Sequence, residues 1–84
     1  MSMEDPVPSF IHDLERILSV AIILQDIDDG PPVVITAAGM VDADSTTLVG
    51  RGDTEDAAWR DLAVAISSWR NVDPRTIRTF IAGI

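Results

Sequence analysis

The first apolar pattern along the chain has the period of a helix. Residues at offsets of 0, 1, 4, 7 and 8 share one helical face, and here they are Phe10, Ile11, Leu14, Ile17 and Leu18. We therefore expect a helix over residues 9–18, with Ser9 as the N-cap because its hydroxyl can accept a hydrogen bond from the first turn. From residue 19 to residue 25 the period changes to two and β-branched residues favour a strand. A helix that continues through Leu24 is the alternative.

Two further strands are expected after a break at residues 28–32, where two aspartates are followed by Gly-Pro-Pro. Residues 33–41 are typical of a strand and end in small residues. Residues 42–45 favour a turn, because short polar side chains bond to their own backbone there. Residues 46–51 then form the third strand, so that the last two strands make a hairpin.

The strongest helix signal follows the third strand. Asp53 or Thr54 is expected to cap it, and Glu55 and Asp56 place negative charge at its partially positive N-terminus. Asn71 is a suitable stop. The expected buried stripe consists of Ala58, Leu62, Ala65, Ile66 and Trp69.

A short helix is expected at the end of the chain. Asp73 can serve as its N-cap and Pro74 suits its first position, while Gly83 can end it; a strand over residues 76–81 is the alternative. The predicted order is thus α-β-β-β-α with a short C-terminal helix. This is an α+β fold, a two-layer sandwich with a three-stranded antiparallel sheet.

Length and composition limit the function classes. The 84 residues allow one small domain over residues 1–84, with a flexible segment at 1–8 and a helical tail at 73–84. Large catalytic folds are excluded by length. The absence of cysteine excludes disulfides and thiolate metal sites. The N-terminus is acidic rather than signal-like, and no apolar run approaches the ~20 residues of a membrane span, so we expect a cytoplasmic protein with no membrane contact.

Charge and aromatic residues suggest a protein interface. The formal net charge is −8, with −6 in residues 1–30, −4 in residues 31–61 and +2 in residues 62–84. The two tryptophans lie about 80° apart on one helix, so at least one is expected in the core, and a half-exposed tryptophan is a frequent interface anchor. The candidate interface residues are Trp59, Trp69, Arg70, Arg75, Arg78 and Phe80.

Motifs that suggest catalysis have simpler explanations. His12 has Ser9 and Asp13 near it in sequence, but these offsets on a helix do not converge as a catalytic triad. The run from Asp42 to Thr46 is similar to the nucleophile motif of haloacid-dehalogenase-type phosphatases, whose fold needs a far longer chain. A hairpin turn explains it better. We expect no enzyme activity, no cofactor and no metal site, with weak calcium binding at the acidic turns left open.

Several short motifs resemble the double-stranded RNA-binding domain over residues 8–67. That family opens with a short helix after a proline, like the run 8–14 here, and has a Gly-Pro turn between its first two strands, like 30–32. It ends its third strand with Gly-x-Gly and enters an alanine-rich helix, like 50–52 and 57–58. The resemblance implies the same order of helices and strands.

The residues that bind RNA in that family differ here. Its second helix usually begins with a lysine pair that holds phosphates, and the matching positions are Glu55 and Asp56. A histidine usually follows its Gly-Pro turn, where this chain has Val33. In the first helix only His12, and not Asp13, could approach RNA. Carboxylates repel phosphates, so the resemblance implies the scaffold and the protein contacts, often dimerisation, of some family members.

Three functional hypotheses follow. The first is a small, acidic, non-enzymatic protein-interaction module that forms a homodimer. The second is an acidic inhibitor or antitoxin-like protein that binds a basic, nucleic-acid-binding surface of a partner; the strand-strand-helix unit from Val33 onward is similar to small antitoxins of the HicB type. The third is duplex RNA binding through Arg70, Arg75 and Arg78, which the overall charge disfavours.

Overall fold

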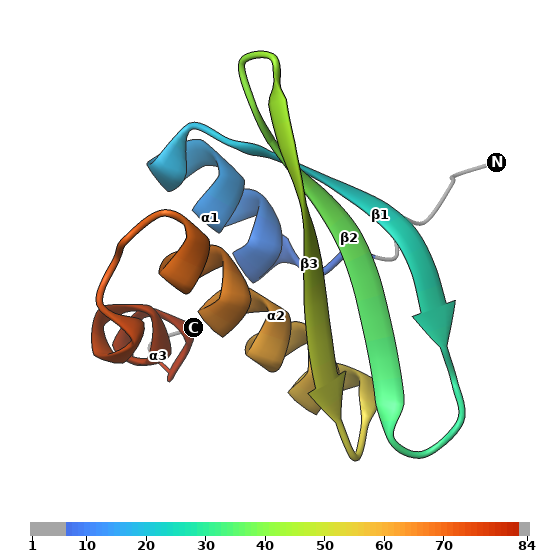
Figure 1. Ribbon diagram of the computed structural model, residues 1–84. Helices are drawn as coiled ribbons and strands as arrows, with labels where there is room; N and C mark the ends of the chain where they lie inside the picture. The colour runs from blue at the N-terminus through green and yellow to red at the C-terminus, as the bar shows by residue number, and fades with distance from the viewer. Residues whose placement is uncertain (1–6, 83–84) are drawn as a thin grey trace, which may run out of the picture.

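The protein has two layers, a three-stranded sheet and helices that cover one of its faces (Figure 1). The computed structural model describes residues 7–82. This confirms the predicted α+β fold, with a helix, three antiparallel strands, a helix and a short C-terminal helix. The elements follow in the order α1 (Ser9–Leu18), β1 (Ala21–Asp28), β2 (Val33–Val41), β3 (Asp44–Gly52), α2 (Glu55–Trp69) and α3 (Pro74–Ala82).

The start of α1 differs from the prediction. Ser9 is the first helical residue, and Pro8 takes the N-cap position with an extended backbone and no side-chain cap bond. The expectation that Ser9 caps the helix is therefore wrong. The Pro8 carbonyl accepts the amides of Ile11 and His12 at 3.1 and 3.4 Å, so these two amides bond to the backbone and not to a capping side chain.

The end of α1 explains the change of period after residue 18. Ser19 has a left-handed backbone, with φ 54° and ψ 49°, and the amide of Val20 closes the helix on the Glu15 carbonyl at 3.0 Å. A left-handed residue is a common helix end. The alternative of a helix through Leu24 is wrong, because the chain turns at Ser19 and enters β1.

The three strands pair in sequence order, β1 with β2 and β2 with β3, all antiparallel. Ile35 lies in the centre of the sheet and pairs with Ile27 on one side and Gly50 on the other. The register of β1 shifts between Leu24 and Asp26, as at a β-bulge.

Two strands are longer than the sequence predicts. β1 continues past residue 25 to Asp28, because Ile27 still packs against the core while its polar neighbours face outward. β3 begins at Asp44 rather than residue 46, because only Asp42 and Ala43 make the turn. Asp42 adopts a left-handed backbone, with φ 54°, a conformation that aspartate tolerates better than most residues.

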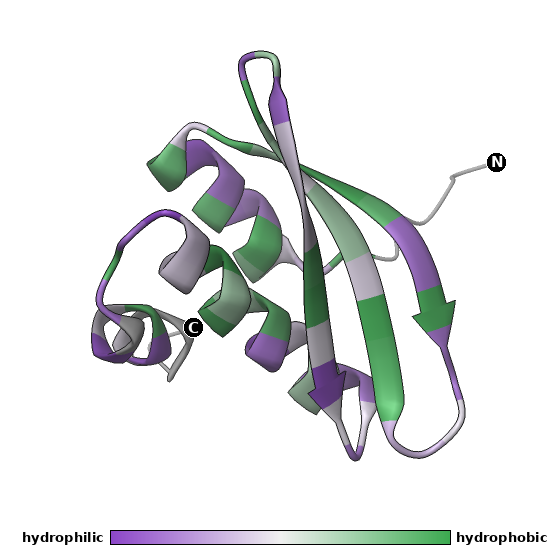
Figure 2. Ribbon diagram, in the orientation of Figure 1, coloured by the Kyte–Doolittle hydropathy of each residue, from purple (hydrophilic) through white to green (hydrophobic). Residues whose placement is uncertain are grey.

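The helix α2 begins and ends at residues that the sequence predicts for these roles. Thr54, rather than Asp53, is the N-cap, and its hydroxyl oxygen accepts the amide of Ala57 at 3.2 Å. The helix ends at Trp69, and Asn71 follows in the left-handed conformation with φ 59°. Figure 2 shows that apolar and polar residues are interleaved along α1 and α2.

The C-terminal helix α3 packs on its own domain, on the side of α2 away from the sheet (Figure 1). Asp73 caps it through its carboxylate, which accepts the amide of Arg75 at 2.9 Å. Ile77 is 4% exposed and belongs to the core. The alternative strand over residues 76–81 is wrong, and the predicted end of the helix at Gly83 lies outside the described residues.

Two glycines let α2 approach β3 closely. A Cβ atom on Gly50 would lie 2.6 Å from the amide nitrogen of Leu62, and one on Gly52 would lie 2.6 Å from that of Ala58. Neither position could hold a side chain without displacing the helix. The Gly-x-Gly end of the third strand is therefore a packing requirement.

None of the helices among residues 7–82 is long and apolar enough to cross a membrane.

Candidate interaction surface

The two faces of the sheet have different surroundings. Successive residues of a strand point to opposite faces, and one set packs beneath α1 and α2. The other set faces away from the helices, and no described helix or strand covers it (Figure 1). We call this second side the open face. Its apolar members are Ala21, Ile23, Val34, Ala38, Met40 and Val49.

The apolar residues of the open face reach solvent. Ile23 on β1 is 50% exposed and Val49 on β3 is 36% exposed. Between them, on β2, Val34, Ala38 and Met40 are half-buried by their neighbours in the sheet. Two-layer folds normally bury an apolar sheet face against another layer. This face instead leaves apolar side chains of all three strands without a covering layer in the described part of the chain, with Thr36, Ser45 and Thr47 between them.

Charged residues occupy one end of the open face. Asp28 pairs with Val34 and Val34 pairs with Arg51, so the three residues form one row across the sheet. The next row of the same face begins with Asp26. In the row of Asp28, an acid on one edge strand and a base on the other therefore flank Val34, about 10 Å apart across two strand spacings.

The two edges of the sheet are each protected by a carboxylate from a helix. Glu15 of α1 accepts the amide of Ile22 on β1 at 2.9 Å. Asp61 of α2 accepts the amide of Arg51 on β3 at 2.9 Å. Both amides belong to edge strands, whose outward groups could otherwise pair with another chain. Two of the acids behind the net charge therefore have structural roles.

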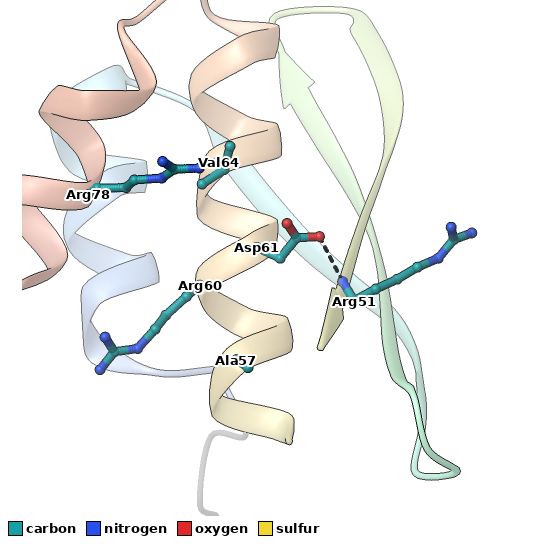
Figure 3. A pocket seen from close by; sticks show the side chains of 6 residues that line it. All are labelled: Arg51, Ala57, Arg60, Asp61, Val64 and Arg78. Carbon is teal, nitrogen blue, oxygen red and sulfur yellow. Dashed lines mark hydrogen bonds between the residues drawn. The ribbon is translucent and has the colours of Figure 1, made fainter. Parts of the chain in front are cut away.

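A hollow of about 330 Å³ lies beside α2 and is lined by Arg51, Ala57, Arg60, Asp61, Val64 and Arg78. Three arginines around one hollow suggest an anion site at first sight. Figure 3 shows that their guanidinium groups point in different directions, with Arg51 directed away from α2. Arg60 also pairs with Asp56, with 3.0 Å between nitrogen and oxygen. The arginines do not converge on a common ligand position.

The predicted interface tryptophans have different environments. Trp59 is 2% exposed, so it is a core residue, one of the two outcomes that its spacing left open. Its indole nitrogen has no hydrogen-bond partner among the described residues. Trp69 is half-buried at the edge of the core, and the Arg70 guanidinium lies 5.5 Å from the centre of its ring, within the range of a cation–π contact.

The other predicted interface residues lie on α3. Arg75 and Arg78 are both exposed, and Arg78 lines the hollow beside α2. Phe80 also belongs to α3, but its side chain lies outside the described part of the structure. The residues of the open face were missed, although the sequence carried a signal. Residues 33–41 are apolar without strict alternation, as is typical of a strand that is covered on both faces.

The residues considered for catalysis or metal binding are not assembled into a site. His12 Nδ1 lies 2.9 Å from a carboxylate oxygen of Glu15, on the exposed side of α1 and not with Ser9. Asp42 and Asp44 are exposed at the β2–β3 turn. Within residues 7–82 no three histidine, aspartate or glutamate side chains gather to hold a metal ion.

Comparison with known protein families, with curated proteins and with solved structures found no match for this chain.

Proposed function

We propose that this protein is a small, acidic, non-enzymatic interaction module that self-associates through the open face of its sheet. The observation that supports the proposal is the uncovered apolar residues of the open face, with Ile23 50% and Val49 36% exposed. Complete burial of a valine or isoleucine contributes about 1.5–3 kcal/mol, and a partly exposed side chain retains a fraction of that. A domain of this size buries only about 60–65% of its unfolded surface, so a second copy also adds to its stability.

A role in protein contacts is compatible with the resemblance of the sequence to double-stranded RNA-binding domains. Some members of that family mediate protein contacts, and such a role does not require phosphate-binding lysines. In this chain, Glu55 and Asp56 are exposed in the first turn of α2. Carboxylates at that position would repel phosphates, and duplex RNA binding is therefore the least supported of the three hypotheses.

A charge substitution on the open face tests the proposal. We expect Ile23→Glu to raise the dissociation constant of the homodimer at least tenfold, because burial would force a carboxylate into an apolar contact. Sedimentation velocity over a range of protein concentrations measures this. Ile17→Glu is the matched control, since Ile17 is 62% exposed on α1, away from the open face, and should leave association unchanged. A protein that stays monomeric at millimolar concentration would contradict the proposal.

A second candidate is an acidic inhibitor or antitoxin-like protein that binds a basic surface. The observation that favours it is the gathering of acids at one end of the sheet. Asp28 and Asp29 lie at the β1–β2 turn, and that turn lies beside the β3–α2 connection because Val33 pairs with Gly52. Glu55 and Asp56 follow this connection.

Affinity capture over a salt series tests the second candidate. A partner held by these carboxylates should be lost steeply as salt rises, and the double substitution Asp28→Asn with Asp29→Asn should weaken its capture. The neutral amide at position 28 can still accept the Gly30 amide that Asp28 accepts at 3.2 Å, so the turn is retained. Capture that does not depend on salt or on these acids would contradict this function.

A further inference from the structure

We propose that two copies pack face to face around a two-fold axis parallel to β2, so that Asp28 of each copy meets Arg51 of the other. The inference rests on the proposed self-association through the open face and adds the arrangement of the two copies. Its basis is the row of the open face that contains Asp28, Val34 and Arg51. In that row the acid and the base lie on opposite edge strands, with β2 between them.

The position of the axis follows from this row. Rotation about an axis along β2 places β1 of one copy over β3 of the other at the same height in the sheet. Asp28 then faces Arg51 of the second copy twice, once on each side of the axis. Val34, Thr36, Ala38 and Met40 lie along the axis and face their own counterparts, while Ile23 faces Thr47 and Asp26 faces Val49 of the second copy. A two-fold interface of this kind uses one surface patch on both copies.

Other face-to-face arrangements do not match the charges. An axis across the strands places β1 over β1 in the opposite direction, so that Asp28 faces Ala21 of the second copy. An orthogonal packing of the two sheets places either Asp28 over Asp28 or Arg51 over Arg51. Like charges in contact disfavour association. Aligned packing of two sheets, with an angle of about 30° between strands, is also one of the common geometries of sheet pairs.

The charged groups are available for this contact. Arg51 is exposed, its side chain points away from α2 (Figure 3), and it makes no ion pair with a residue that the structure describes. Asp28 is exposed and uses one carboxylate oxygen, at 3.2 Å, to accept the Gly30 amide. Its other oxygen can accept from a guanidinium. Asp26, on the same face of β1, adds negative charge beside it.

The size of the open face predicts a weak dimer. Three strands at about 4.8 Å spacing and nine residues at about 3.3 Å each give a projected area of about 400 Å² per copy. A standard interface buries about 800 Å² of accessible surface on each partner. The association should therefore be concentration-dependent, and a charge reversal acts on two contacts because each residue occurs twice in a symmetric dimer.

A pair of complementary charge reversals tests the arrangement. Arg51→Glu places two acids opposite each other in the homodimer, and Asp28→Arg places two arginines opposite each other. We expect each variant alone to dissociate at least ten times more readily than the unchanged protein. An equimolar mixture should restore association as a heterodimer, because both contacts become acid–base pairs again. Sedimentation velocity with one variant labelled measures all three samples.

Controls separate charge from folding. Arg75→Glu makes the same charge change on α3 and should leave association unchanged. Thermal unfolding of each variant shows whether it still folds; if Asp28→Arg does not, Arg51→Glu is compared with Arg51→Gln, which removes the charge pair without placing two acids opposite each other and should weaken association less. A mixture that stays monomeric, or single variants that dimerise normally, would overturn this arrangement while leaving the proposed function in place. Absence of dimers of the unchanged protein would overturn both.

Discussion

The two faces of the same sheet are built from alternate residues of the same strands, yet they differ in almost every other respect. Ile35 and Ala37 of β2 are fully buried beneath the helices, and glycines on β3 let α2 come close. Val34 and Ala38, their neighbours in sequence, lie on the open face. A shift of one residue along β2 therefore separates the side chains that determine folding from those available for association.

The largest expected difference is between two adjacent alanine substitutions. Ile35→Ala should lower the free energy of unfolding by about 2–5 kcal/mol, because it leaves a cavity under α2. Val34→Ala, one residue away on the open face, should lower it by less than about 1 kcal/mol. Urea unfolding followed by tryptophan fluorescence, at a protein concentration too low for association, measures both. Equal losses for the two variants would refute the division between the faces.

A substitution of Gly50 tests how closely α2 packs against the covered face of the sheet. Gly50→Ala should destabilise the fold by about 3 kcal/mol, because the added methyl group meets the backbone of Leu62 and the helix has to move. Gly30→Ala is the matched control: its Cβ atom would lie 3.5 Å from the Asp28 carboxylate, an ordinary contact. Thermal melts of the two variants make the comparison, and a stable Gly50→Ala protein would show that α2 does not pack this closely.

The smallest expected loss of stability comes from a substitution at the β3 edge of the sheet, where Asp61 binds the Arg51 amide. Asp61→Ala removes the acceptor for the outward amide of Arg51, and we expect a loss of about 1 kcal/mol, because the site is exposed and water can replace the carboxylate. Asp61→Asn keeps an acceptor oxygen and should lose less. Hydrogen exchange at the Arg51 amide gives a local readout; protection that is equal in all three proteins would show that the contact is absent in solution.

Much of the fold follows from the sequence because its signals are local. Neighbouring residues determine the ends of the helices. Examples are the cap at Thr54, the left-handed backbone at Asn71 and the start of α3 at Asp73 and Pro74. The apolar pattern predicts a cap at Ser9, the residue that precedes it, whereas Pro8 takes the N-cap position without a side-chain bond. Errors of one or two residues at such ends arise where several local solutions have similar energies.

The candidate surface could not be predicted in the same way, because it depends on long-range pairing. Apolar residues occupy both sides of β2, so its pattern does not show which side the helices cover. The row of Asp28, Val34 and Arg51 exists only once the register of three strands is known. Residue type alone therefore predicts Trp59, which lies in the core, and the arginines of α3 as interface residues.

The carboxylates of Glu15 and Asp61 have a consequence for the size of any assembly. If β1 of one copy paired with β3 of the next, each addition would leave a new free edge, and growth would continue into a fibre. Such pairing would have to displace a bound carboxylate from the Ile22 or the Arg51 amide. A contact through the face of the sheet closes after two copies. The two bound carboxylates thus oppose edge-to-edge polymerisation at the Ile22 and Arg51 amides.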